Sequence, residues 1–142
     1  MTKIEITMLN NYTNRGQNAE QSLAYALCGE IRQHDNVRFD RGSDIPEFNM
    51  SVKSAKASIC HGGSLKATDF DGMVDEFFER VASEKFAYVA KNSIAYIMSK
   101  EMFKQFVKEF ASIGRESKKN GGKQKLRLNS ESKRMMAWLE EK

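Results

Sequence analysis

The sequence predicts a mixed α/β domain. Two kinds of apolar spacing alternate along its 142 residues: apolar side chains recur every three to four residues in some segments and every second residue in others. The first spacing is typical of a helix with one buried face, and the second of a half-buried strand. A chain of this length fits one domain, and its single proline argues against a long disordered linker. We therefore expect one compact domain spanning residues 1–142.

The N-terminal part predicts a short strand and then a long helix. Residues 3–8 are β-prone, and either Thr13 or Asn14 can cap a helix that runs to about Gln33. Glu20 falls on the apolar face of this helix. That face is formed by Leu23, Ala24, Leu27 and Ile31.

Three strands and a second helix are expected next. The strands are residues 37–41, 44–48 and 50–59. After the loop 61–64, Thr68 or Asp69 can cap a helix that ends near Ser83. Its apolar stripe consists of Phe70, Met73, Val74, Phe77 and Val81.

The remainder predicts two strands, a helix, a strand and a final helix. The strands 85–90 and 93–98 are followed by a helix that Ser99 caps and Gly114 ends. The last strand spans residues 124–128, and Asn129 or Ser130 caps the final helix. The order is that of a mixed α/β sandwich.

Composition narrows the class of protein. No apolar stretch approaches the roughly 18 residues that a membrane-spanning helix needs, and the N-terminus lacks a signal-peptide pattern, so we expect a cytoplasmic protein without a membrane partner. Two cysteines are too few for a disulfide scaffold. A zinc site can be imagined from four residues, but their spacing is not that of known zinc motifs. They are Cys28, His34, Cys60 and His61.

Positive charge is concentrated near the C-terminus. The net charge is +4, but residues 115–134 carry eight basic and two acidic side chains, which leaves the rest of the chain at −2. Such a run is typical either of a surface that faces a polyanion or of a solvated loop and hairpin. The candidate nucleic-acid contacts are Lys118, Lys119, Lys123, Lys125 and Arg127.

The segment from Asp44 to Lys53 contains candidate catalytic residues. Asp44 begins one expected strand and Lys53 lies on the next, with only a few turn residues between them. Such a hairpin can bring the carboxylate and the ammonium together on one face. A carboxylate that holds a divalent ion, beside a lysine that positions or activates water, is the minimal equipment for phosphodiester hydrolysis.

At these residues the chain resembles the PD-(D/E)xK nucleases, a superfamily that includes many restriction endonucleases and archaeal Holliday-junction resolvases. Asp44 matches the motif aspartate, and 51–53 match the (D/E)xK tripeptide, with Ser51 in place of its acid. The family core of a helix, three strands, a helix and a further strand matches the order expected for residues 15–98. The resemblance implies a restriction endonuclease-like core at about 13–98, with a basic C-terminal extension at about 99–142 that adds helices.

The resemblance also implies further ligands. In many relatives the first helix supplies a glutamate, and Glu20 fits that role, although it can also be read as a first-turn acid that the helix dipole stabilises. Some relatives with Ser-x-Lys take the missing carboxylate from a downstream helix, where Glu76 is the first candidate. The other candidates are Asp69, Asp71 and Glu47.

Together these features predict a metal-dependent DNA endonuclease. Asp44 and an acid from Glu20 or Glu76 would hold Mg²⁺ or Mn²⁺, and Lys53 would assist the attacking water. Duplex cutters of this size usually need two active sites, so a homodimer is expected. The alternative is a nuclease-fold protein that lost metal binding with the acid at Ser51 and binds nucleic acid or another protein, such as a phage or mobile-element accessory factor.

Overall fold

A four-stranded mixed sheet forms the centre of the computed structural model, which describes residues 1–30 and 43–142. Its order is β1-β4-β3-β2. The bounds are β1 (Thr2–Glu5), β2 (Met50–Ser54), β3 (Lys85–Val89) and β4 (Ile94–Ser99). β4 pairs antiparallel with both β1 and β3, whereas β2 pairs parallel with β3. The predicted α/β class is therefore confirmed.

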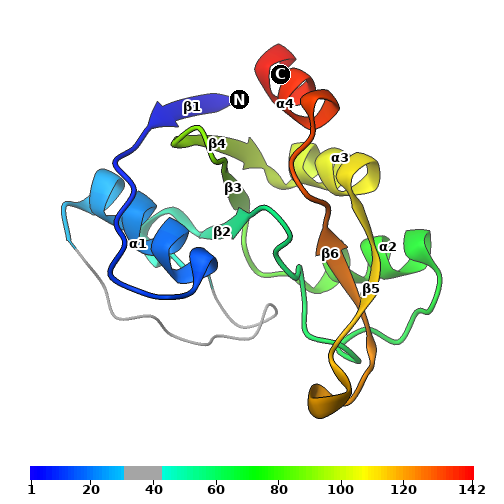
Figure 1. The fold of residues 1–142 in the computed structure, drawn as a ribbon. Coiled ribbons are helices and arrows are strands. Elements are labelled where there is room, and N and C mark those ends of the chain that lie inside the picture. Colours follow the sequence, from blue (N-terminus) through cyan, green and yellow to red (C-terminus); the bar gives the residue numbers. More distant parts are fainter. Residues whose placement is uncertain (31–42) are drawn as a thin grey trace.

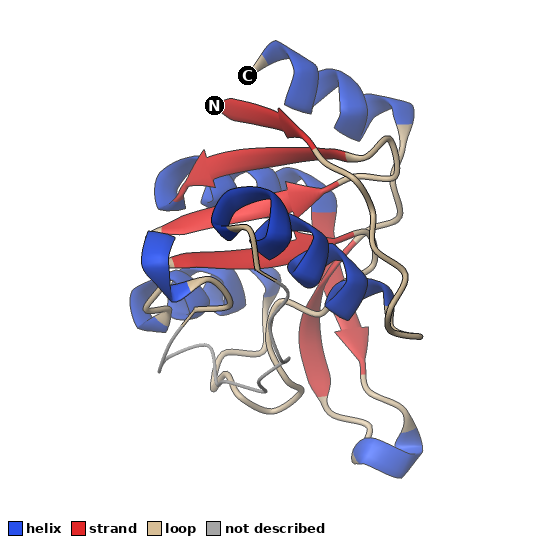
Figure 2. Ribbon diagram, turned by 90° about the vertical axis from the view of Figure 1, so that its left-hand side faces the viewer, coloured by secondary structure: helices blue, strands red, loops and turns tan. Residues whose placement is uncertain are grey.

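Helices cover both faces of this sheet (Figures 1 and 2). α1 (Arg15–Cys28) packs on one face. The opposite face is covered by α2 (Phe70–Arg80), α3 (Lys100–Phe110) and α4 (Lys133–Glu141). Because successive strand residues point to opposite faces, β3 sends Phe86 and Tyr88 to the second layer and Ala87 and Val89 to α1.

The two layers differ in size and composition. The larger core is rich in aromatic rings: Phe86 stacks on Phe103 at 4.4 Å between ring centroids, and Trp138 of α4 contacts Phe106 at 5.5 Å. The smaller core places Ala19 and Leu23 of α1 against the sheet. Small side chains on α1 let the helix approach β2 closely, which positions its N-terminal residues beside that strand.

A separate two-stranded hairpin projects from this body (Figure 1). β5 (Ala111–Arg115) and β6 (Gln124–Leu128) pair antiparallel, and the short 3-10 helix η2 (Lys118–Asn120) lies at their tip. Gly121 and Gly122 have φ of 105° and 64°, which favours glycine at both positions. The helix expected to continue to Gly114 instead ends at Phe110, because the ladder with β6 satisfies the backbone of residues 111–115.

The segment around Asp44 differs from the expected strand 44–48. Only Ile45 makes a bridge, to Met50, and Pro46–Phe48 forms the 3-10 helix η1. Proline has no N–H to donate to a ladder and its fixed φ suits the first turn of a helix, which explains the change. The strand expected over 50–59 ends at Ser54 because Lys56 adopts φ 62° and turns the chain.

Other boundaries differ from the expected ones by a few residues. The N-caps Asn14, Asp69 and Ser99 are confirmed, whereas the final helix is capped by Ser132. α1 ends before Gly29, which has φ 73° and donates its N–H to Tyr25, instead of near Gln33, and α2 ends at Arg80. The expected strand 37–41 and residue 33 lie outside the described residues, and β1 is shorter than expected, ending at Glu5.

Candidate functional site

Asp44 is held against the backbone of β2. Its Oδ2 accepts a hydrogen bond from the Val52 N–H at 2.7 Å. Among the described strands β2 has a neighbour on one side only, so this bond lies along its other edge. A carboxylate offers about four lone-pair sites, so the bond leaves capacity to bind a cation.

Lys53 follows Val52 and is half-buried. Its Nζ donates to the carbonyl oxygens of Ser58 at 3.4 Å and Ile59 at 3.5 Å. Burial lowers the pKa of Lys53, and the charges of Asp44, Cys60 and Glu20 oppose that shift only in part. The ammonium is thus less favourable here than in water, and the group gives up its proton more readily.

Glu20 reaches the same place from α1. The side chain of Asn14 caps the helix by accepting from Gly16 N at 2.7 Å and Gln17 N at 3.3 Å, and α1 begins at Arg15. Glu20 therefore lies in the second helical turn, so it is not a first-turn acid that the helix dipole stabilises. It is 8% exposed. A carboxylate this buried needs partners, which a decorative surface acid does not.

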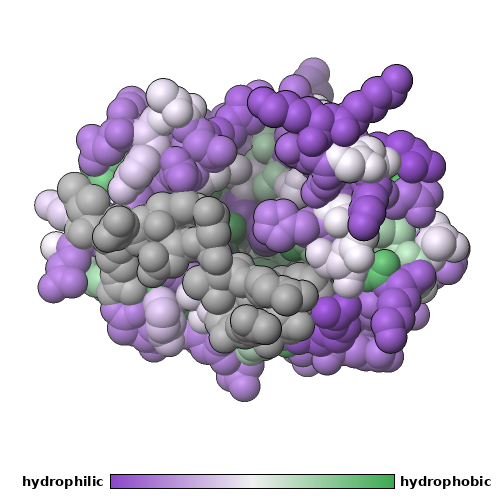
Figure 3. All heavy atoms as spheres, turned by 90° about the horizontal axis from the view of Figure 1, so that it is seen from below, coloured by the Kyte–Doolittle hydropathy of each residue, from purple (hydrophilic) through white to green (hydrophobic). Residues whose placement is uncertain are grey.

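One cavity of about 280 Å³ joins these three residues. Glu20, Asp44 and Lys53 line it from α1, from the segment before η1 and from β2. The other described residues that line it are Asn14, Gly16, Gln17, Val52, Ser54, Ala57 and Ser58. Seen from below, the molecule is hydrophilic over most of its surface and hollowed near the centre (Figure 3). The structure thus brings together the aspartate, the lysine and the helical glutamate that the sequence singled out.

Ser51 lies apart from this cavity. Its Oγ is 2.6 Å from the Oγ of Ser83, which is fully buried on the connection between α2 and β3. The hydroxyl therefore has a structural partner at the other end of β2. The serine that stands in the place of the motif acid tethers β2 to this connection.

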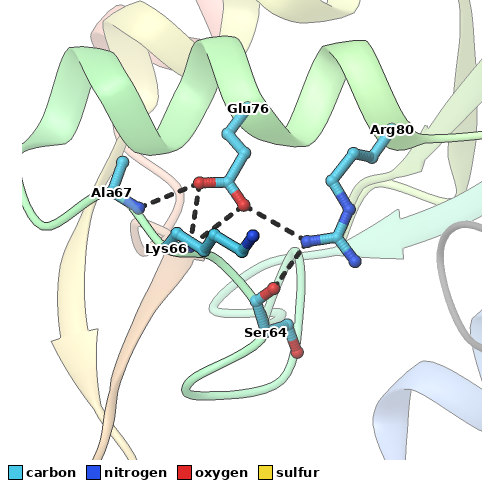
Figure 4. Close-up of polar contacts among 5 residues, drawn as sticks. All are labelled: Ser64, Lys66, Ala67, Glu76 and Arg80. Atoms are coloured by element: carbon cyan, nitrogen blue, oxygen red, sulfur yellow. Dashed lines mark hydrogen bonds and ion pairs between the residues drawn. The ribbon is translucent and has the colours of Figure 1, made fainter.

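Glu76, the first downstream candidate, is bonded to the loop before α2 (Figure 4). Its carboxylate accepts from the backbone N–H groups of Lys66 (2.8 and 3.0 Å) and Ala67 (2.9 Å), and from Arg80 at 3.2 Å. Arg80 in turn donates to the Ser64 carbonyl at 2.7 Å. These bonds lower the pKa of Glu76, those from the backbone most. Glu76 holds the 64–67 loop on α2 and does not line the cavity.

The other candidate acids also lie outside the cavity lining. Asp69 caps α2 by accepting from Gly72 N at 3.1 Å. Asp71 is exposed in the first turn of α2, and Glu47 is exposed in η1.

Two carboxylates fit a magnesium ion better than a zinc ion. Mg²⁺ is commonly held by one or two carboxylates and keeps several waters, which matches Asp44 and Glu20. Across residues 1–30 and 43–142, no group of three or more His, Cys, Asp or Glu side chains is placed as a metal site. Of the imagined zinc residues, His34 lies outside the described part, Cys60 is buried and Cys28 is half-buried.

The basic residues of the C-terminal run separate into three places. Lys118 and Lys119 lie in η2 at the hairpin tip. Lys123 packs against the 62–65 loop, where a Cβ on Gly63 would come within 2.6 Å of its Cδ. Lys125 and Arg127 lie on β6.

Two cations missed by the sequence reasoning lie beside the candidate site. Arg15 and Lys56 line a neighbouring cavity of about 500 Å³, which shares Asn14, Gly16, Ser54, Ala57 and Ser58 with the first. Lys56 adopts a left-handed backbone conformation, with φ 62°, which the alternation of a regular strand does not predict.

Within the described parts of the chain, no helix is long and apolar enough to span a bilayer. Comparisons with known proteins found no family model that matches and no significant match among curated proteins or solved structures.

Proposed function

We propose that this protein is a metal-dependent DNA endonuclease of the PD-(D/E)xK type. One observation carries the proposal: Asp44, Glu20 and Lys53 line the same cavity although they come from three separate segments. Two carboxylates beside a lysine of lowered pKa are the groups that phosphodiester hydrolysis requires. The finer fold assignment that we propose is a restriction endonuclease-like core; of its order, the described residues contain α1, the single strand β2, α2 and β3.

The roles follow from the chemistry of each residue. Asp44 and Glu20 would hold a Mg²⁺ ion, or Mn²⁺ in its place. When bound, such an ion polarises the phosphate and lowers the pKa of bound water. Lys53 orients the attacking water and can take up its proton, because burial makes the neutral amine more accessible than in solution. The carboxylate of the buried Glu20 also compensates part of the charge of the Lys53 ammonium in the cavity.

The departure at Ser51 is compatible with this scheme. Its hydroxyl bonds to Ser83 and adds no ligand to the cavity, where the carboxylates contributed by the described residues are Asp44 and Glu20. Two carboxylates suffice for an ion that keeps its waters. DNA as the partner, a homodimer and a cytoplasmic location remain parts of the proposal.

The test is cleavage of plasmid, single-stranded and branched DNA with Mg²⁺, Mn²⁺ or EDTA. Asp44→Asn and Glu20→Gln should each reduce the rate by more than about 100-fold, which exceeds the loss typical of residues outside the ligand shell. Mn²⁺ affinity by calorimetry should fall in parallel. Asp75→Asn, which removes an exposed carboxylate paired with Lys104, is the matched control and should leave both unchanged.

The rival function predicts the opposite result. If the wild-type protein cuts no DNA form with any metal and takes up no Mn²⁺, the nuclease proposal is wrong and the non-catalytic binding protein stands.

A further inference from the structure

The basic hairpin is joined to the candidate site by a third strand-like segment. Residues 56–59, which follow β2, run antiparallel to β6. Ile59 N donates to the Leu126 carbonyl and Leu128 N to the Ala57 carbonyl, both at 2.9 Å. Ser58 and Arg127 form a bridge between these two bonds. Together, 56–59, β6 and β5 make a three-stranded ribbon.

The side chains of this ribbon separate by face. Directly opposite residues of an antiparallel pair share a face. Ile59, Leu126 and Leu128 are buried toward the larger core. Ser58 stands opposite Arg127, and Arg127 stands opposite Ser112 on β5. All three of these residues are exposed, so the other face is directed to solvent.

The solvent face of the ribbon is basic, and the carboxylate of Glu116, which directly follows β5, accepts from Gly62 N at 2.7 Å. We define the solvent face by Ser58, Ser112, Gly114, Lys125, Arg127 and Asn129. Lys125 lies two residues from Arg127, opposite Gly114. A Cβ on Gly114 would lie 3.7 Å from the Arg127 Nε, so the guanidinium extends over the glycine. Neither cation forms an ion pair within the described chain. The residues beside Lys125 and Arg127 are small and neutral, so a phosphate backbone can approach these two cations closely.

This face continues directly into the candidate site. Ser58 belongs to the ribbon face and also lines the cavity with Asp44 and Glu20. Its carbonyl accepts from Lys53 Nζ at 3.4 Å. Lys56, two residues earlier and exposed, lines the neighbouring 500 Å³ cavity with Arg15. Cations thus flank Ser58 on both sides.

We propose that the ribbon face binds the phosphate backbone of a nucleic-acid strand and that this strand crosses Ser58 to enter the cavity of Asp44, Glu20 and Lys53. The inference rests on the proposed function, because it supplies that site with its substrate path. It narrows the basic run to Lys125 and Arg127 and adds Lys56. Lys123 is turned toward the 62–65 loop, and Lys118 and Lys119 are confined to the tip.

The experiment is binding of a fluorescently labelled 30-base-pair DNA in EDTA, followed by anisotropy at several salt concentrations. Lys56→Ala, Lys125→Ala and Arg127→Gln should each weaken binding and reduce the salt slope by about 0.9 for every phosphate that the variant no longer neutralises. Ser58→Glu should weaken binding at least roughly tenfold, because its carboxylate would face the phosphates. Lys108→Ala and Ala137→Glu, on the exposed faces of α3 and α4, are the matched controls and should bind as the wild type does.

The outcomes separate this inference from the nuclease proposal. If the ribbon variants bind DNA like the controls, and their melting temperatures show that they are folded, the proposed role of the ribbon face is wrong. This holds even if the wild type cuts DNA. If the variants bind DNA more weakly but the wild-type protein cuts no DNA, the ribbon face is supported as a binding site and the nuclease proposal is rejected. Displacement of the DNA by polyglutamate of equal charge, at equal concentration, would make the face a site for acidic protein and overturn the proposal.

Discussion

At the scale of single residues, burial of the Lys53 ammonium in the candidate site lowers the stability of the folded protein. An ammonium is costly to bury, and here the carboxylates of Asp44 and Glu20 offset that cost only in part, since the pKa of Lys53 still falls. A structural lysine would gain by reaching solvent. Retaining it in the cavity is understandable if the group handles a proton, and active sites often sacrifice stability in this way.

This destabilisation predicts a pH-dependent gain from Lys53→Met, which removes the charge and keeps the length. A lowered pKa means that the folded protein holds this proton less tightly than the unfolded chain, so the penalty is present below the folded pKa and disappears as pH rises toward 10.5. The variant should be more stable than the wild type at pH 7, and the difference should shrink by pH 10. Urea unfolding at both pH values measures it.

Lys56→Met is the control, because it makes the same change at an exposed position. It should show no such pH-dependent gain. Equal stabilisation by Lys53→Met at pH 7 and pH 10 would mean that desolvation of the ammonium is not the cause.

At the scale of elements, helices were easier to predict than strand ends. The caps Asn14, Asp69 and Ser99 and the apolar stripes of α1, α2 and α3 are local features, so spacing and capping chemistry suffice to find them. β5 is the contrary case. Residues 111–113 continue the helical pattern of α3, and only pairing with β6, the other strand of the hairpin, makes them a strand.

In the candidate site, too, local features could be predicted from the sequence and long-range contacts could not. Asp44 and Lys53 could be paired from the sequence because a short turn joins their segments, and Glu20 because it interrupts an apolar stripe. The role of Glu76 could not be foreseen, because its partners are backbone N–H groups of a loop whose path the sequence does not reveal. The pairing of 56–59 with β6 was likewise invisible, since it joins segments about 70 residues apart.

The attachment of the 64–67 loop to α2 predicts the behaviour of Glu76→Gln. The pKa of Glu76 is lowered, so its contribution to stability is present above its ordinary value of 4.5 and is lost as pH falls through the folded value. The variant should be less stable than the wild type at pH 7, with a deficit that vanishes in acid. Hydrogen exchange should speed up at the amides of Lys66 and Ala67.

Glu79→Gln, on an exposed position of the same helix, controls for the loss of a charge from α2. Abolished Mn²⁺ binding with unchanged exchange at Lys66 and Ala67 would contradict the loop role and restore Glu76 as a ligand.

At the scale of the whole molecule, the termini and the two cores are tied together. Lys3 on β1 donates to the Glu140 carbonyl at 2.8 Å, and Tyr96 on β4 donates to the Glu140 carboxylate, so the C-terminal helix closes over the N-terminal strand (Figure 1). Met135 and Leu139 of α4 are fully buried in the larger core. α4 is thus part of the packed body even though it lies in the basic C-terminal part of the sequence.

This integration predicts that both layers unfold as one unit. Leu23 in the smaller core and Leu139 in the larger one are both fully buried, on opposite faces of the sheet. Each change to alanine should cost about 2–5 kcal/mol of unfolding free energy. Because the two side chains belong to separate cores on either side of the sheet, the double variant should equal the sum within about 0.5 kcal/mol.

Two probes follow the unfolding in urea. Circular dichroism reports on all helices, whereas the fluorescence of Trp138, the single tryptophan, reports on α4 against α3. In a two-state protein the transitions coincide for the wild type and for all three variants. If Leu139→Ala made the fluorescence transition precede the circular dichroism transition, α4 would unfold as a separate unit. The candidate site, built on α1 and β2 against the other face, would then persist without it, and DNA cleavage at intermediate urea concentrations would show whether it does.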